Sequence, residues 1–239
     1  MSGARSTARQ GSDAPWAAAL LACAALAIAA PPWALGQPWL AYVFKPLATL
    51  VVITYAAQRR GGRAVVRRWV LAGLALSMAG DVALLWPEEG FVAGLVAFLL
   101  AHLAYLRAFT RERRLAARRL PFVVYALVAA SILALLWPGV PAPLRAPVVA
   151  YVVCLASMAA QAAVLWQERV ARAGVLALGG ALFVASDALL ATNRFALALP
   201  ASSLWILASY WAAQWCFASW LPRASAATTA GSPPANSRP

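Results

Sequence analysis

Long apolar segments separated by short arginine-rich connections dominate this sequence. Eight of these segments, each of about 17–20 residues, lie at 16–35, 40–57, 69–86, 91–109, 121–137, 147–166, 174–191 and 203–221. A helix of that length crosses a hydrocarbon core of about 30 Å at about 1.5 Å per residue. The pattern therefore predicts an all-α polytopic membrane protein with eight transmembrane helices. Residues 1–15 would form a cytoplasmic N-terminal segment, 16–221 the transmembrane domain, and 222–239 a disordered tail rich in Ser, Thr, Ala and Pro.

Composition and charge distribution agree with a membrane location. The chain is 64% hydrophobic and only 11% charged, whereas soluble domains are about 45–50% apolar and about 25% charged. A net charge of +13 in a soluble chain would suggest nucleic-acid binding. Here the arginines lie in the connections, so we interpret the charge as a signal of membrane orientation and expect no nucleic-acid partner.

The arginines also predict which end of each helix faces the cytoplasm. With the N-terminus inside, almost all of them fall in inner connections, and the outer connections hold only Arg145 and Arg194. The positive-inside bias therefore places both termini in the cytoplasm, and we expect a bacterial-type inner membrane. A cleaved signal peptide is the alternative for the first segment, because Arg5 and Arg9 precede an alanine-rich run.

Four ionisable residues stand out inside the apolar segments: Asp81, Asp187, the only lysine Lys45 and the only histidine His102. A charge in hydrocarbon costs roughly 2.5–3.5 kcal/mol on insertion scales, so such residues indicate a functional site. Helix geometry puts Lys45, Asp81 and Asp187 at a similar shallow depth, about 8 Å below the outer surface for Lys45, with His102 about 16 Å down. We expect the two aspartates to share a polar pocket. A weak repeat that aligns 75–81 with 181–187 suggests two parallel four-helix halves.

Further polar residues would surround this pocket, and several have simpler interpretations. Asn193 and Arg194 would lie at its mouth and, with Lys45 and Tyr105, form candidate substrate-binding positions. Lys45 could instead neutralise one aspartate as a structural ion pair, and a lone His102 is more often a hydrogen-bonded residue between helices. One histidine and scattered cysteines offer too few ligands for zinc, so we expect neither metal nor other cofactor, with a hard cation between the carboxylates as the alternative. No motif indicates an oligomeric state.

Several ordered motifs carry a family resemblance. FKPLATL at 44–50, SMAGDVALL at 77–85, FVAGLVAFLLAHLAY at 91–105, and GALFVASD at 180–187 with NRF at 193–195 resemble motifs of the YhhN-like lysoplasmalogenase family. The resemblance implies eight spans and hydrolysis of the vinyl ether bond of lysoplasmalogens. The products would be a fatty aldehyde and glycerophosphoethanolamine or glycerophosphocholine. Another lysolipid or ether becomes the expected substrate if the host lacks plasmalogens.

The implied reaction suits a pair of buried aspartates. Protonation of the outer alkene carbon of a vinyl ether gives an oxocarbenium ion, water adds, and the hemiacetal collapses. One carboxylic acid and one carboxylate are the groups that glycosidases also use for such a transition state. Burial and a second negative charge both favour keeping one proton on the pair. We favour Asp81 as the acid and Asp187 as the carboxylate, with His102 positioning water and Lys45 or Arg194 holding the phosphate.

Two other functional classes use buried carboxylates in membranes. A small-solute or proton-coupled transporter would need the same residues near the middle of the bilayer. An intramembrane aspartyl protease also places two aspartates on different helices. Such proteases resemble one another in a Gly-x-Gly-Asp motif, where this chain has Met78-Ala79-Gly80-Asp81. The hydrolase remains the favoured reading, and vesicle transport assays would separate it from the transporter.

Overall fold

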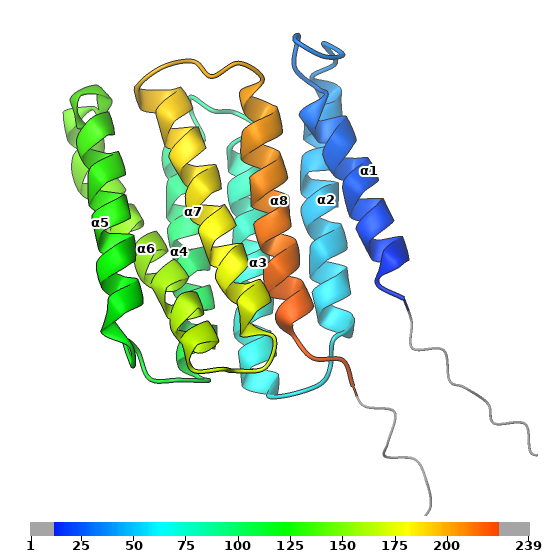
Figure 1. Ribbon diagram of the computed structural model, residues 1–239. Helices are drawn as coiled ribbons and strands as arrows, with labels where there is room; N and C mark the ends of the chain where they lie inside the picture. The colour runs from blue at the N-terminus through cyan, green and yellow to red at the C-terminus, as the bar shows by residue number, and fades with distance from the viewer. Residues whose placement is uncertain (1–11, 225–239) are drawn as a thin grey trace, which may run out of the picture.

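The computed structural model describes residues 12–224, and in this range the chain forms eight α-helices joined by short connections (Figure 1). Two short 3-10 helices, Trp137–Gly139 and Ala142–Leu144, lie between the fifth and sixth α-helices. The α-helices are α1 Ala14–Ile28, α2 Trp39–Gln58, α3 Ala64–Ala83, α4 Phe91–Thr110, α5 Arg119–Leu136, α6 Arg145–Gln167, α7 Ala173–Phe195 and α8 Ser202–Trp220.

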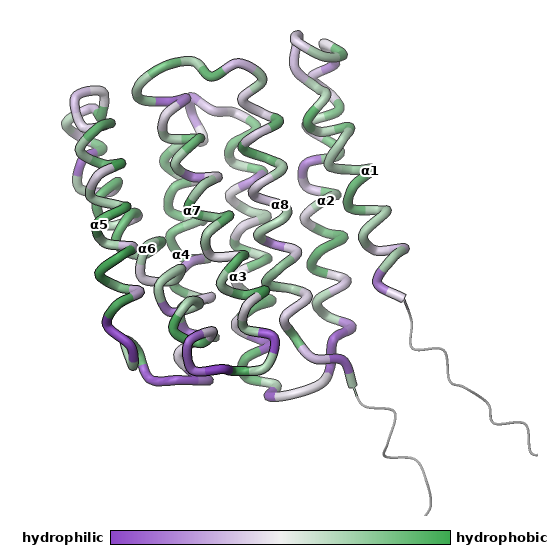
Figure 2. Tube along the Cα trace, viewed as in Figure 1, coloured by the Kyte–Doolittle hydropathy of each residue, from purple (hydrophilic) through white to green (hydrophobic). Residues whose placement is uncertain are grey.

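Consecutive helices form antiparallel pairs, and the α3–α4 and α7–α8 pairs have the most extensive packing. The connections α2–α3, α4–α5 and α6–α7 lie at one end of the bundle, where α1 begins and α8 ends (Figure 1). Figure 2 shows that this end is the more hydrophilic one. The arginine-rich connections of the sequence therefore gather at one end, which we call the arginine-rich end.

The helical class predicted from the sequence is confirmed, and the molecule is a helical membrane protein. Five helices in the described range are long and apolar enough to span a bilayer: Trp39–Gln58, Phe91–Thr110, Arg119–Gly139, Ala142–Gln167 and Ala173–Phe195. Helix α1 is shorter, with 15 residues. Helix α3 contains Arg67, Arg68 and Asp81, and α8 contains Gln214 and several serines. Length and composition thus support five spans, while eight spans and two parallel halves stay predictions.

The largest differences from the expected helix ends are in α1, α3 and α7, and α3 begins at Ala64 rather than at Trp69. Helix α1 ends at Ile28 rather than at Leu35, because Pro31 and Pro32 follow three and four residues later and proline disfavours a helical residue before it. Helix α7 continues to Phe195 instead of ending at Ala191, so Asn193 and Arg194 belong to its last turn. The longer α7 places both side chains on a rigid element.

The predicted terminal segments fall mostly outside the described residues. This applies to residues 1–11 and 225–239. The first tail residues, however, make defined contacts: the amide of Gly61 donates a hydrogen bond to the carbonyl of Pro222 at 3.0 Å. Arg223 forms an ion pair with Asp13 at 2.5 Å. The chain beyond α8 therefore begins against the α2–α3 connection.

Helix α5 is the least buried helix of the bundle. Only Pro121 and Leu136 among its 18 residues are buried, whereas α6 behind it buries eleven residues. Leu120, Leu127 and Leu135 are more than 60% exposed, as expected for a helix whose outer face meets lipid. The position of α5 at the edge of the bundle (Figure 1) makes it one wall of the cavity described next.

Candidate functional site

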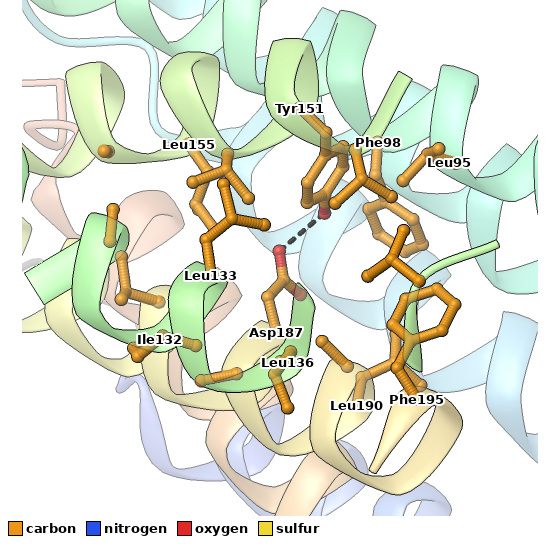
Figure 3. Close-up of a pocket in the computed structure, with 18 of the residues that line it drawn as sticks. Leu95, Phe98, Ile132, Leu133, Leu136, Tyr151, Leu155, Asp187, Leu190 and Phe195 are labelled. Atoms are coloured by element: carbon orange, nitrogen blue, oxygen red, sulfur yellow. Dashed lines mark hydrogen bonds between the residues drawn. The ribbon is translucent and has the colours of Figure 1, made fainter. Parts of the chain in front are cut away.

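An apolar cavity runs between α5 and the rest of the bundle, with walls from α4, α5, α6 and α7 (Figure 3). Of the lining residues in the described part of the chain, Asp187 supplies the only carboxylate, and Tyr125 and Tyr151 supply the hydroxyl groups. The other lining residues are apolar: Leu84, Phe91, Leu95, Phe98, Ala129, Ile132, Leu133, Leu136, Val140, Val148, Val152, Leu155, Ala156, Val184, Ala188, Leu190, Ala191 and Phe195. A cavity of this composition suits a hydrocarbon chain and offers one acidic group to it.

Asp187 is held at the wall of this cavity by a tyrosine from the neighbouring helix. The Tyr151 hydroxyl donates a hydrogen bond of 2.5 Å to Asp187 Oδ2 (Figure 3). Val184, Asp187 and Ala191 recur every three or four residues along α7 and line the cavity together, because that spacing places side chains on one face of a helix. Oδ2 is therefore engaged by Tyr151, and the carboxyl group stands among apolar neighbours.

Asp81 occupies a different environment, which is polar and closed. The hydroxyls of Thr49 and Tyr210 each donate to Asp81 Oδ2 at 2.7 Å, and Lys45 Nζ lies 3.9 Å from Oδ1. The indole of Trp211 in turn donates to Thr49 Oγ1 at 3.1 Å. Because Asp81 is only 1% exposed, these donors take the place of water as the hydrogen-bond partners of its carboxyl group. Hydroxyl and ammonium donors suit a carboxylate.

The two aspartates therefore have separate sets of partners. Within residues 12–224, no hydrogen bond links Asp81 with Asp187. Aromatic side chains form the connection between their environments: Phe98, which lines the cavity, packs edge-on against Tyr210 with ring centroids 5.8 Å apart. The structure brings Lys45 together with Asp81, and Asp187 together with Tyr151. A shared dyad stays a prediction.

The remaining site residues predicted from the sequence lie in three places. His102 is fully buried, and its ring packs edge-on against Tyr151 at 5.2 Å and Phe183 at 4.7 Å, with neither nitrogen hydrogen-bonded in the described structure. Tyr105 is also fully buried and donates to Gln214 Oε1 at 2.6 Å. The Asn193 side chain accepts a hydrogen bond from the amide of Leu199 at 2.9 Å, so it orders the connection after α7.

Arg194 lies at the cavity end that is formed by the last turn of α7. Its guanidinium donates two hydrogen bonds to Glu88, at 2.6 and 3.0 Å, and stands 5.2 Å from the centre of the Phe91 ring. The hydrogen bonds and charge of Arg194 hold the pKa of Glu88 below its usual range. Arg194 is thus paired with a residue of the α3–α4 connection that the sequence did not single out.

Three further residues of the site were not predicted from the sequence: Tyr151, Thr49 and Tyr210. Each is an uncharged polar residue in an apolar segment, where such residues commonly face lipid headgroups or neighbouring helices. The available signal was positional: Tyr151 follows the start of α6 by six residues, a depth similar to that of Asp187 on α7. Hydroxyl groups at the depth of a buried carboxylate are the donors it needs.

Together these features define an integral helical membrane protein with an acidic group at the wall of an apolar cavity. The sequence model of the YhhN family matches residues 40–221, and this chain belongs to that family. It is 35% identical to lysoplasmalogenase TMEM86B of Sus scrofa over 181 residues, 74% of each chain. It is 32% identical to the lysoplasmalogenase of Mycobacterium bovis over 191 residues, 75% of this chain and 69% of that protein. Human TMEM86B, also a lysoplasmalogenase, is 32% identical over 178 residues. No solved structure matches the chain.

Proposed function

We propose that this protein hydrolyses the vinyl ether bond of a lysoplasmalogen to a fatty aldehyde and a glycerophospho-head-group alcohol. The observation that carries the proposal is the position of Asp187, a carboxyl group in the wall of an otherwise apolar cavity. The names of the relatives support the same reaction. They do not favour the alternative of a transporter.

The spacing of two residues on α7 supports the way in which such a lipid would bind. Asp187 and Arg194 are seven residues apart, so they lie on nearly the same face of the helix and about 10 Å apart along its axis. Seven bonds separate the phosphorus of a lysoplasmalogen from the outer vinyl carbon, which spans about 8 Å at the per-bond rise of an extended chain. With its phosphate near Arg194, the lipid would bring its vinyl ether to Asp187.

The remainder of the cavity would hold the hydrocarbon chain. Its lining continues past Asp187 to Leu155 and Ala156 on α6 and to Tyr125 and Ala129 on α5. Tyr125 and Leu136, both in the lining, are eleven residues apart on α5, or about 16 Å. The cavity therefore runs along the helix axes, as lipid chains do in a bilayer. Only α5, whose outer face is exposed, separates the cavity from the surrounding lipid.

In the proposed reaction Asp187 first acts as an acid. Its proton goes to the outer alkene carbon, the carbon–carbon π bond supplies the electron pair, and an oxocarbenium ion forms at the carbon bonded to oxygen. Water adds to that carbon and returns a proton to the Asp187 carboxylate. The bond from the hemiacetal carbon to the glycerol oxygen then breaks, the hemiacetal hydroxyl loses its proton to form the aldehyde, and the glycerol oxygen gains a proton to form the alcohol. One carboxyl group can serve as acid and then base, as in glycosidases.

Asp81 would act as the permanent carboxylate of the site. Lys45, Thr49 and Tyr210 all offer it donors, so these contacts favour its ionised form. Among residues 12–224, Tyr151 is the one hydrogen-bond donor to Asp187, so Asp187 suits the role of proton donor better. This assignment reverses the one favoured from the sequence. His102, packed on the Tyr151 ring, would help to position the attacking water.

The same proposal includes the membrane topology. Eight spans with the arginine-rich end in the cytoplasm would place both termini inside, in agreement with the positive-inside bias. The cavity end at Arg194 and Phe91 would then face the outer leaflet of a bacterial-type inner membrane. Lysolipid headgroups lie at that level, so the substrate would enter from the leaflet without crossing the bilayer.

The test is aldehyde release by the purified protein in detergent from an alkenyl lysophospholipid, beside its ester-linked analogue. Wild-type protein should release aldehyde from the alkenyl lipid only. Asp187→Asn should lower kcat by about 10²- to 10⁴-fold, the range for loss of a general acid. Asp81→Asn should also lower it, by removing the charge that stabilises the cation. Full activity in Asp187→Asn, with the protein folded, would exclude Asp187 as the acid.

A further inference from the structure

The cavity ends about halfway along α7. Its deepest lining residue on that helix is Val184, three residues or about 5 Å beyond Asp187. On α6 the deepest lining residue is Ala156, five residues or about 8 Å beyond Tyr151, whose hydroxyl holds Asp187. Two helices of opposite direction therefore agree that the cavity extends only about 5–8 Å past the carboxyl group.

Close packing of α6 against α7 forms a floor at this depth. Gly180 lies one turn beyond Val184, and a Cβ there would be 3.1 Å from Cα of Ala159 and 3.4 Å from Cβ of Ala162. The backbones of the two helices thus approach each other closely just below the deepest lining residues. A hydrocarbon chain does not fit between them, so a chain that passes Asp187 cannot continue straight along the helix axes.

The space beyond Asp187 is too short for the chain of a membrane lipid. An extended chain advances about 1.2 Å per bond, so a depth of about 5–8 Å holds about four to six carbons. A chain that reaches the middle of the bilayer needs about 15 Å, half of a hydrocarbon core of about 30 Å. The end of such a chain must therefore lie outside the cavity.

The wall formed by α5 is the weakest side of the cavity. Helix α5 packs along α6 and only sparsely against α7. Its two buried residues, Pro121 and Leu136, lie near its two ends, so no residue of the stretch between them is buried. Within that stretch Ala129 and Leu133 line the cavity and are half-buried (Figure 3). The middle of α5 is thus the place where the cavity and the surrounding lipid are least separated.

We infer that the hydrocarbon chain of the substrate bends at the cavity floor and leaves between α5 and α7, so that its far end stays in the bilayer. This inference rests on the proposed function, because it assigns the path of that substrate's chain. Small lining residues leave room for a methylene chain at this opening: Ala129 on α5, and Ala188 and Ala191 on α7. The cavity then binds only about four to six carbons beyond the vinyl ether.

This arrangement loses little binding free energy. Lipid chains are about as apolar as the residues that line the cavity, so burying the rest of the chain in protein would add no hydrophobic driving force. The protein needs to enclose only the part of the lipid that reacts. Substrates with longer chains, and chains that carry a bulky group at the far end, should therefore bind equally well.

The experiment locates the far end of a bound chain. The probe is a saturated 1-O-alkyl lysophospholipid that carries pyrene at the end of a chain of about twelve carbons, twice what the cavity holds. It has no vinyl ether to hydrolyse, and a brominated detergent quenches pyrene only on contact. The probe bound to full-length protein should be quenched nearly as strongly as in protein-free micelles, and unlabelled lysolipid should compete for its binding. Ala129→Trp should weaken this binding about tenfold, because the indole fills the opening.

Ala130→Trp is the matched control, because Ala130 is the adjacent alanine of α5, is exposed and does not line the cavity. It should bind the probe as the wild type does. Overturning results would be a bound probe shielded from the quencher, binding without competition, or equal binding by Ala129→Trp and the wild type. Aldehyde release from the alkenyl substrate is assayed in parallel. Competed, quenched binding without aldehyde release would reject the proposed hydrolase and keep the chain path, and the converse would reject the chain path alone.

Discussion

At the scale of single residues, the contacts of Asp187 explain how a half-buried carboxyl group can be both oriented and available to the cavity. The Tyr151 hydroxyl donates to its Oδ2 at 2.5 Å, which fixes the orientation of the carboxyl group toward the cavity. Tyr151→Phe removes this hydrogen bond and leaves the ring in place. We expect kcat for aldehyde release to fall about tenfold or more, as for other hydrogen bonds to ionisable groups, with little change in KM.

Tyr125→Phe is the control for this residue. Tyr125 lines the same cavity from α5, and its hydroxyl makes no hydrogen bond in the described part of the chain. Steady-state kinetics of both variants on one alkenyl substrate should separate them clearly. An equal decrease in both would mean that the cavity simply tolerates no change of polarity, and Tyr151 would lose its positioning role.

The sequence revealed the acidic residues of this site and Lys45, the ion-pair partner of Asp81, but not the hydroxyl groups that hydrogen-bond to the two aspartates. Asp81, Asp187 and Lys45 were found because a charge is rare in an apolar segment. Tyr151 and Tyr210 were not, because tyrosine is common in membrane helices, and only the packing of α6 and α8 brings their hydroxyls to the carboxyl groups. The separation of the two aspartates also depends on packing. Phe98 of α4 packs against Tyr210 of α8, and these two helices are distant in sequence.

At the scale of helices, close packing of α3 against α4 positions one wall of the cavity. A Cβ added at Gly80 would lie 2.5 Å from Cε2 of Phe98, and the Phe98 ring is held on other sides by Tyr210 and Phe183. Gly80→Ala should therefore push this ring toward the cavity or separate the helices. We expect a loss of stability of about 1–3 kcal/mol, as for other overpacked cores, together with a higher KM.

Gly174→Ala provides the comparison, because a Cβ there would meet only Trp166, at an ordinary 3.6 Å. Thermal unfolding in one detergent, with KM for the alkenyl lipid, would measure both effects. Equal unfolding midpoints for Gly80→Ala and Gly174→Ala would show that α3 and α4 adjust without strain.

Helix positions were predicted well because apolar runs of membrane length are distinctive, whereas helix ends were not. The end of α1 depends on Pro31 and Pro32. The prediction followed the apolar run past these prolines and so placed the end of the helix too late. The extension of α7 to Phe195 has no strong local signal. The last turn of α7 makes contacts elsewhere in the fold, including those of Arg194 with Glu88 and Phe91. Such contacts join segments about 100 residues apart, so the sequence alone gave little indication of them.

At the scale of the whole molecule, a buried arginine fastens the arginine-rich end. Arg59 is 3% exposed and donates to the carbonyl groups of Leu221 and Ser219 at 2.6 and 2.8 Å. It also pairs with Asp13 at 3.2 Å. From the sequence, Arg59 was interpreted like the other arginines of the inner connections, as a charge that orients the protein in the membrane. Its contacts instead join the end of α2 to the end of α8 and to the residue before α1.

Asp13 should make the stability of this assembly depend on pH. Burial raises the pKa of its carboxyl group, but a hydrogen bond to Tyr55 and the charges of Arg223 and Arg59 outweigh burial and hold the pKa below the usual 3.8. A lowered pKa in the folded state means that Asp13 stabilises the fold above about pH 4, and that this contribution disappears as the pH falls below that value. Asp13→Asn should thus lower the unfolding midpoint at pH 7 and reduce the further loss of stability between pH 5 and pH 3.

The same pH scan of thermal unfolding on Glu89→Gln, which changes an exposed carboxylate at the other end of the bundle, should follow the wild type. If Asp13→Asn also followed it, the ion pairs of Asp13 would contribute nothing to stability, and Arg59 would act through the Tyr55 hydroxyl and the carbonyl groups of Ser219 and Leu221.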